Sequence, residues 1–107
     1  MENLRTREVE NLLYVLSKLD DCDELFALLE DLFTIREIKE TSQRLDVARL
    51  LASGKSYNLV EQATGASTTT IARVSKCLSY GAGGYKRAFE VLADKPGVLD
   101  KASQEGN

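Results

Sequence analysis

The chain has 107 residues, of which 43% are hydrophobic and 29% are charged, as expected for one small globular domain with a modest core. It contains no apolar run approaching the roughly 20 residues of a membrane span. Residues 1–8 are rich in charge and lack the apolar stretch of a signal peptide. We therefore expect a cytoplasmic protein that has no membrane partner.

The net charge of −3 is distributed unevenly along the chain. Residues 8–31 contain eight acidic residues and one basic residue, whereas residues 55–87 contain five basic residues and one acidic residue. A basic third can form a phosphate-binding surface even when the whole chain is negative. The negative net charge therefore does not exclude nucleic-acid binding, and residues 55–87 are the candidate region for it.

Apolar residues at helical spacing, together with a single proline at Pro96, predict an all-α fold. The first helix is expected from about Leu4 to Leu19, and its apolar positions extend past one face. These positions are Val9, Leu12, Leu13, Tyr14, Val15, Leu16 and Leu19. A helix that is apolar on two sides must be covered on both. In so small a domain, a partner subunit is the natural cover.

Capping residues mark the next two helices. A second helix follows Asp21, which is a favourable N-cap. Thr34 and Glu37 form a Thr-x-x-Glu capping box, which predicts a third helix over about residues 35–51. Gly54 then supplies the glycine that commonly ends a helix.

Two short helices follow, joined by a tight turn. Ser56 is the expected N-cap of a helix over about residues 57–63, and Ser67 that of a helix over about residues 68–80. Thr64-Gly65-Ala66 lies between them. Two short helices joined by a three-residue turn that contains glycine describe a helix-turn-helix.

The remaining chain completes the predicted architecture. Residues 81–84 are three glycines and an alanine, which should end the fifth helix before a last one over about residues 85–92. From residue 94 the composition becomes polar, so residues 94–107 are expected to be a disordered tail. The prediction is one helical domain over residues 1–93, with its helix-turn-helix over about residues 56–80.

The fifth predicted helix has two distinct faces. Apolar residues at spacings that would lock the helix-turn-helix are Val60, Ala66, Ile71 and Val74. On the other face, Thr68, Thr69 and Ala72 are short enough to approach base edges and thymine methyl groups in the major groove. Side chains expected to contact phosphates are Ser56, Arg73, Lys76 and Lys86. The alternative is a helical hairpin in which residues 67–70 are only a solvated cap.

A wider set of positions follows the pattern of a known family. They are Leu32-Phe33-Thr34, Glu37, Arg44, Leu51, Gly54, Ser56, Gly65-Ala66 and Thr70-Ile71-Ala72-Arg73. With these positions, residues 29–78 resemble the Trp repressor superfamily, and within it a Trp-repressor-related group of small Gram-positive proteins. Glu61 stands where many helix-turn-helices have a small residue, but that family tolerates a long charged one.

The resemblance implies a Trp-repressor-like fold of six helices per chain in an intertwined homodimer. It implies a sequence-specific transcriptional regulator that binds a palindromic operator in double-stranded DNA. The two fifth helices would contact half-sites about one helical turn apart. A rival interpretation is a dimeric protein-interaction module that has lost DNA binding and uses its acidic first third as a contact surface.

The resemblance also implies an effector pocket. The matching positions are Thr34, Arg44, Thr70, Arg73, Val74 and Cys77. The Trp repressor has glycine where this chain has Val74 and serine where it has Cys77, so the branched side chain would fill space that an indole needs. Tryptophan is therefore not the expected ligand. Another small effector remains open, and the absence of any effector is favoured.

The same positions have plainer explanations. Thr34 is fully explained as an N-cap, Arg44 can pair with Glu40 four residues before it, and Arg73 can be only a phosphate contact. Cys22 is expected, like the other cysteine, to be a reduced thiol packed as a small apolar group. Without histidine, a CxxC motif or a partnered nucleophile, the sequence predicts no metal, no cofactor and no enzyme.

Overall fold

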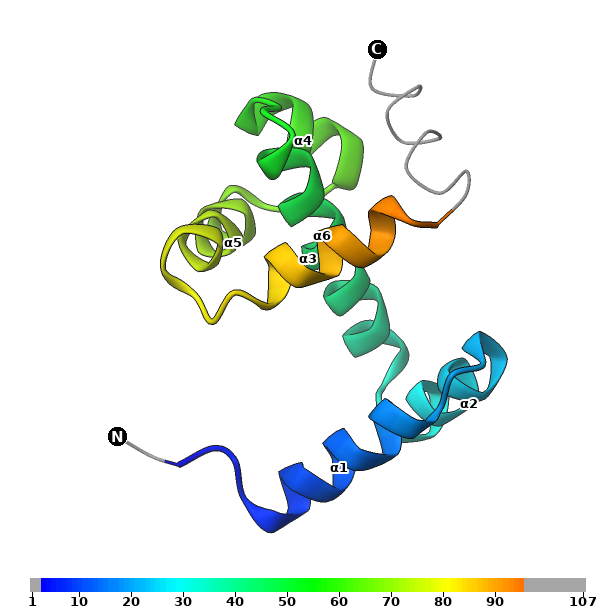
Figure 1. Ribbon diagram of the computed structural model, residues 1–107. Coiled ribbons are helices and arrows are strands. Elements are labelled where there is room, and N and C mark those ends of the chain that lie inside the picture. Colours follow the sequence, from blue (N-terminus) through cyan, green and yellow to red (C-terminus); the bar gives the residue numbers. More distant parts are fainter. Residues whose placement is uncertain (1–2, 96–107) are drawn as a thin grey trace. The chain divides into compact units, whose positions relative to one another are not determined.

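Residues 3–95 are described by a computed structural model, and the regular structure in that range is entirely α-helical (Figure 1). The helices are α1 (Arg7–Lys18), α2 (Cys22–Leu32), α3 (Ile35–Ala52), α4 (Tyr57–Thr64), α5 (Thr68–Tyr80) and α6 (Gly84–Ala93). This confirms the predicted all-α class and the predicted order of six helices. Most of the predicted tail, residues 96–107, lies outside the described residues.

The chain forms two compact units, residues 1–38 and residues 39–107, and the boundary falls just after the first turn of α3. They are called the first unit and the second unit below. No helix in residues 3–95 combines the length and hydrophobicity required to cross a bilayer.

Helix α1 begins at Arg7 and not at Leu4, so the predicted start is wrong by three residues. The reason is the cap: Thr6 has an extended backbone, and its hydroxyl accepts the Val9 N–H at 3.3 Å. A residue that satisfies a free N–H group fixes the start more strongly than an apolar side chain does. Leu4 lies before the cap and is 76% exposed.

The first unit has no buried side chain among its described residues, 3–38. Leu13, Tyr14 and Phe26 are 41%, 65% and 54% exposed. Yet α2 is capped as predicted, because the Asp21 carboxylate accepts the Asp23 N–H at 3.1 Å. The first unit therefore has well-formed helix ends and no core of its own.

Helix α3 starts with the predicted capping box. The Thr34 hydroxyl accepts the Glu37 N–H at 3.1 Å, and the Glu37 carboxylate accepts the Thr34 N–H at 2.9 Å. The helix ends at Ala52, close to the predicted end, and Gly54 follows with a positive φ of 90°. The two reciprocal bonds satisfy two backbone N–H donors at once, and the Thr-x-x-Glu pattern that forms them made this boundary predictable from the sequence.

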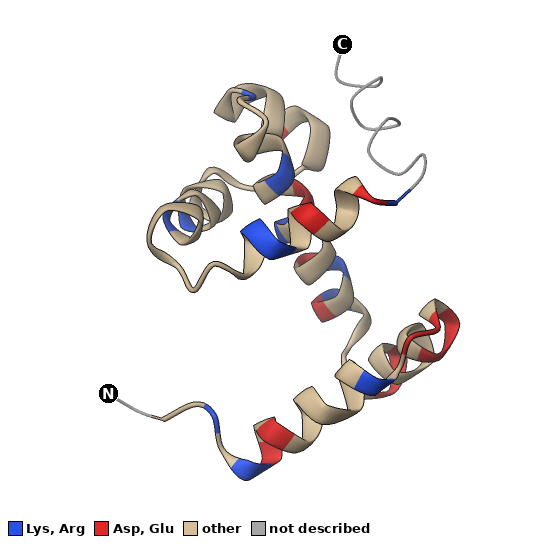
Figure 2. Cartoon of the chain, viewed as in Figure 1, with Lys and Arg blue, Asp and Glu red and all other residues tan. Residues whose placement is uncertain are grey.

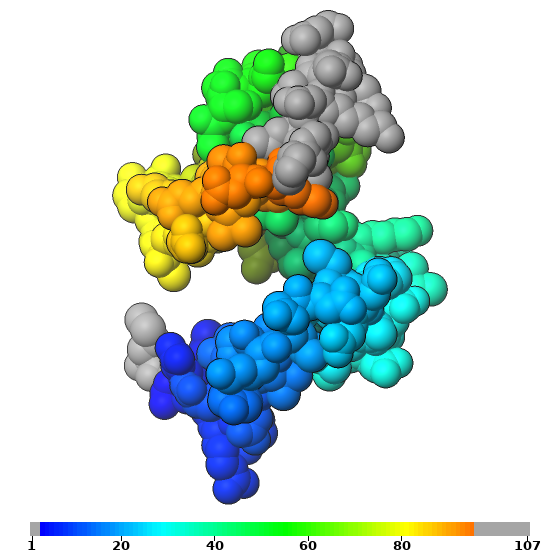
Figure 3. Space-filling view, turned by 45° about the vertical axis from the view of Figure 1, so that its right-hand side comes forward, coloured from blue at the N-terminus to red at the C-terminus, as the bar shows by residue number. Residues whose placement is uncertain are grey.

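The core of the second unit lies between the C-terminal half of α3 and helices α4 and α5. Its buried members are Val47, Ala48, Leu50, Val60, Ala66, Ile71 and Val74, each at most 4% exposed. Packed against them are the partly buried Leu51, Leu78, Tyr85 and Phe89. The last two residues bring α6 onto the core, on the near face of the second unit in Figure 3.

The chain changes direction between α5 and α6. Helix α5 ends at Tyr80, and the Gly81 N–H donates to the Cys77 carbonyl oxygen at 2.8 Å. A Cβ atom at Gly81 would lie only 2.4 Å from that same oxygen, so no other residue fits without a backbone shift. Beyond the turn, the rings of Tyr85 and Phe89 stack with centroids 6.2 Å apart.

The two thiols do not lie where the sequence placed them. Cys22 and Cys77 are free, as expected, but both are exposed and neither is packed as a small apolar group. Cys22 is the first residue of α2, in the unit without a core, and Cys77 lies on the outer side of α5. Helical spacing alone did not distinguish these positions from core positions.

Candidate nucleic-acid interface

Helices α4 and α5 form two arms around a three-residue turn. The Ser56 hydroxyl accepts the Leu59 N–H at 3.2 Å and begins α4. Gly65 ends it with a left-handed backbone, φ 73°, and donates its N–H to the Glu61 carbonyl at 2.9 Å. The Ser67 hydroxyl then accepts the Thr70 N–H at 3.1 Å and begins α5. The caps and the left-handed glycine match those predicted from the sequence.

The inner faces of the two arms meet in the core. Val60 of α4 and Ile71 of α5 are both 0% exposed, Val74 is 1% exposed, and Ala66 in the turn is 2% exposed. These are the residues that the sequence predicted to lock the arms together. Complete burial of a valine or isoleucine side chain stabilises the folded state by roughly 1.5–3 kcal/mol. The arms are therefore held by apolar packing as well as by the turn.

The outer face of α5 carries the residues predicted to contact DNA. Thr68, Thr69, Ala72, Arg73 and Lys76 are all exposed. The first two occupy the first turn of the helix, and the two cations come later along it. Ser56 is also exposed, at the start of α4, although its hydroxyl already serves as a cap. Burial of Ile71 and Val74 fixes which face of α5 meets solvent.

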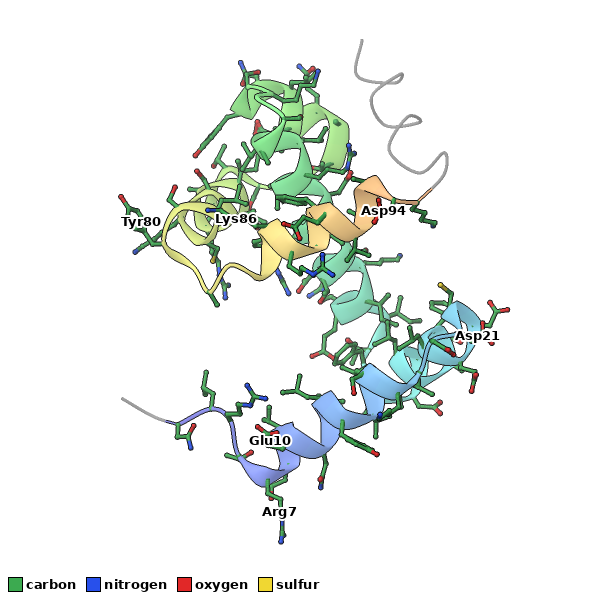
Figure 4. The ribbon with its side chains drawn as sticks, in the orientation of Figure 1. Arg7, Glu10, Asp21, Tyr80, Lys86 and Asp94 are labelled. Carbon is green, nitrogen blue, oxygen red and sulfur yellow. The ribbon has the colours of Figure 1, made fainter. Side chains whose placement is uncertain are left out.

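Charge differs between the two units. In Figure 2, red acidic residues concentrate on α2 and the segment before it, whereas the second unit carries both signs, with blue basic residues on α5 and on the first turn of α6 as well as on α3. Lys86 is exposed on that first turn, and the neighbouring Arg87 pairs with Glu90 at 2.8 Å. Tyr80, at the end of α5, is 84% exposed and points away from the helices (Figure 4).

The residues that match the effector pocket fall into different environments. Thr34 belongs to the first unit and is occupied as the N-cap of α3. Arg44 is partly buried on α3, and its Nη2 donates to the Thr41 hydroxyl at 3.3 Å. Thr70 is partly buried, and its hydroxyl accepts a hydrogen bond from Ser67 at 3.1 Å.

The other three pocket positions lie on α5. Arg73 and Cys77 are exposed, whereas Val74 is part of the core. Its side chain is packed among Val47, Ala48 and the other core residues. Among residues 3–95, no three His, Cys, Asp or Glu side chains gather in a way that could hold a metal ion.

One feature of the site was not anticipated from the sequence. The side-chain amide of Gln43, on α3, donates to the carbonyl oxygen of Thr64, the last residue of α4, at 3.1 Å. The two residues are 21 positions apart. A hydrogen bond between residues so distant leaves no periodic signal in the sequence. The Thr64-Gly65-Ala66 turn did show where the acceptor lies, but it could not show the donor.

The model of the family described as Trp repressor protein matches residues 7–93. YerC of Bacillus subtilis (strain 168), a protein of uncharacterised function, is 42% identical over 90 residues, which are 84% of this chain and 86% of that protein.

Two solved structures share the fold. One is a candidate Trp repressor from Staphylococcus aureus, with a TM-score of 0.81 and 34% identity over 86% of this chain and 92% of that one. The other is a TrpR-like protein from Eubacterium eligens, with a TM-score of 0.81 and 44% identity over 85% of this chain and 94% of that one. The predicted Trp-repressor-like fold is thereby confirmed, and the chain belongs to the Trp repressor family.

Proposed function

We propose that this protein is a homodimeric, sequence-specific DNA-binding regulator of transcription in which α5 enters the major groove. The observation that carries the proposal is the two-sided character of α5. Ile71 and Val74 are buried, so the exposed face presents Thr68, Thr69 and Ala72. Short side chains near the N-terminus of α5, the second helix of the helix-turn-helix, allow this helix to approach base edges closely.

Contacts to the DNA backbone come from longer or more peripheral side chains. Arg73 and Lys76 follow the short residues along α5, and both are exposed. Ser56 at the start of α4 and Lys86 at the start of α6 are exposed as well. Phosphate contacts of this kind fix the position of the protein on the duplex and supply most of the salt-dependent affinity for DNA.

The proposal of a homodimer rests on the first unit. Helices α1 and α2 bury no side chain within the chain, and they expose large apolar residues such as Tyr14 and Phe26. Short helices without tertiary packing are marginal in water, so these faces need a cover. A second copy that intertwines its helices with the first supplies one. Its twofold symmetry would match a palindromic operator.

We further propose that tryptophan is not the effector. The side chain of Val74 is 1% exposed and belongs to the same core cluster as Val47 and Ala48 of α3, which supports the expectation that its branched side chain fills space that an indole needs. Among the other matched positions of the second unit, Arg44, Thr70, Arg73 and Cys77 are candidates for a different small ligand, although the absence of any effector is favoured. Calorimetric titration of the purified protein should detect no binding of tryptophan at micromolar concentrations, and clear binding there would refute this part of the proposal.

The decisive experiment for DNA binding is selection of duplexes from a random pool by the purified full-length chain. We expect enrichment of a palindrome whose half-sites are about one helical turn apart. The proposal fails if repeated rounds enrich no common sequence while the protein remains folded.

The acidic, apolar first unit favours one competing function, that of a dimeric protein-interaction module without DNA binding. All eight acidic residues of the region 8–31 are exposed. The two functions differ in a simple measurement. A DNA-binding face predicts retention on heparin or on random duplex at low salt and release as salt rises, whereas the interaction module predicts passage through both.

A further inference from the structure

The hydrogen bond from Gln43 to Thr64 joins the scaffold helix α3 to the end of α4. Both side chains are partly buried, and the Nε2-to-oxygen distance is 3.1 Å. The acceptor is the carbonyl group directly before Gly65, where the backbone turns left-handed. The bond therefore acts at the point where the direction of the chain changes.

The Thr64 side chain completes the same turn. Its hydroxyl donates to the Val60 carbonyl at 2.7 Å and accepts the Ala66 N–H at 3.2 Å. Together with the bond from Gly65 to Glu61, these contacts satisfy successive backbone groups of the turn. Gln43 is the contact that ties this local network to a different helix.

We propose that Gln43 is a positioning residue for DNA recognition: it anchors the turn to α3 and so fixes the direction in which α5 leaves it. This inference rests on the proposed function. Apolar packing of Ile71 and Val74 keeps α5 against the core, but the hydrophobic effect has no preferred direction. A hydrogen bond depends on the angle between its donor and acceptor and can therefore fix an orientation. Side chains that contact base edges must be placed within roughly half an ångström of the productive geometry. Lysine side chains that contact phosphates are flexible and tolerate larger displacements of the helix.

The test uses substitutions of Gln43 that separate its size from its N–H group. Gln43→Met keeps the length and removes the donor. Gln43→Glu keeps the shape and directs a second acceptor at the Thr64 carbonyl. Gln43→Lys restores a donor of similar reach. Ser42→Ala is the matched control, because the adjacent Ser42 is exposed and its hydroxyl bonds only locally, to the Lys39 carbonyl at 3.0 Å.

Each full-length variant is titrated against the selected operator and against a scrambled duplex of equal length. Loss of one hydrogen bond predicts a roughly three- to tenfold loss of operator affinity for Gln43→Met, and at least as much for Gln43→Glu. Affinity for the scrambled duplex should change less than about twofold, because the phosphate contacts remain. Gln43→Lys should recover the ratio of the two affinities, and Ser42→Ala should leave it unchanged.

Amide hydrogen exchange provides a second readout that does not involve DNA. In Gln43→Met, exchange at Gly65 and Ala66 should accelerate, while exchange at Ile71 in the core should not. An operator-to-scrambled ratio equal to that of the wild type would overturn the inference. So would an equal fall in both affinities, which would indicate general destabilisation.

The two proposals fail in distinguishable ways. If the wild-type protein selects no operator, the proposed function fails and the positioning role falls with it. If the wild type binds its operator and Gln43→Met binds it equally well, only the positioning role fails. Unchanged exchange at the turn would also remove the positioning role, whatever the DNA measurements show.

Discussion

The two units of the molecule contain equally well-marked helices but differ in what stabilises them. In the first unit, Thr6 and Asp21 cap their helices, yet none of the described side chains is buried. In the second unit, Ser56 and Ser67 cap theirs, and side chains such as Ile71 are fully buried. Local sequence signals thus define helices whether or not the same chain supplies the packing that keeps them folded.

The largest effect should come from removing part of the second unit's core. Ile71→Ala should lower the free energy of unfolding by about 2–5 kcal/mol, because it leaves a cavity beneath α5. Chemical denaturation at several protein concentrations would measure it. Ala72→Ser, at the next and exposed position, is the control and should change stability by less than about 0.5 kcal/mol. A similar loss in both variants would mean that the two faces of α5 are not distinct.

A smaller effect is expected from the apolar face of α1. Leu13 is 41% exposed in the single chain and would become buried in the proposed dimer. Leu13→Ser should weaken association by about 1–3 kcal/mol per chain. Sedimentation equilibrium should show more monomer at low concentration, whereas Tyr80→Ser, which removes an exposed ring from the second unit, should not shift the equilibrium. An unaltered association constant for Leu13→Ser would show that this face is not the one covered.

Matched cap substitutions compare the two units directly. Ser67→Ala and Thr6→Ala each remove one N-cap bond, worth about 1 kcal/mol. For Ser67→Ala, we expect a lower melting temperature, since α5 is part of a core that the chain supplies itself. For Thr6→Ala, the loss should depend on protein concentration, because α1 needs a partner to be ordered. Losses that are independent of concentration in both would contradict the contrast between the units.

The smallest effect on stability, with the clearest effect on function, is expected from paired lysine substitutions. Lys76→Ala should leave folding almost unchanged and reduce the slope of log affinity against log salt for any duplex by about 1. Lys18→Ala makes the same charge change on α1 and should leave that slope unchanged. Thr69→Ala should instead alter sequence preference. Equal slopes for wild type and Lys76→Ala would place the phosphate contacts elsewhere.

Helix boundaries in this chain follow from local rules, and most could be predicted. Thr34 and Glu37 form the expected capping box, and Gly65 has the expected left-handed backbone. Local rules also separated the faces of α5, since Ile71 is buried and Arg73 is exposed. Each of these features depends on residues only a few positions apart, so the sequence alone is enough to predict it.

Features that depend on distant residues were not predictable. Val47, Ala48 and Leu50 are the buried residues of α3, whereas Leu45 and Leu51, which are just as apolar, are only partly buried. Which face of α3 is inside depends on where α4 and α5 pack, and its own periodicity does not decide that. The Gln43 contact and the exposure of the two thiols also depend on how distant helices pack, so the sequence did not predict them.

The sharp exit from α5 has a consequence for how this gene can vary. At Gly81, the first carbon of any side chain would occupy the space of the Cys77 carbonyl oxygen. At Gly84, only three positions later, nothing lies within 4 Å of such a carbon. These two glycines, one at the end of α5 and one at the start of α6, should therefore respond to random mutation in opposite ways. In a saturation library, codon 81 should retain glycine almost alone, while codon 84 should accept alanine and serine freely.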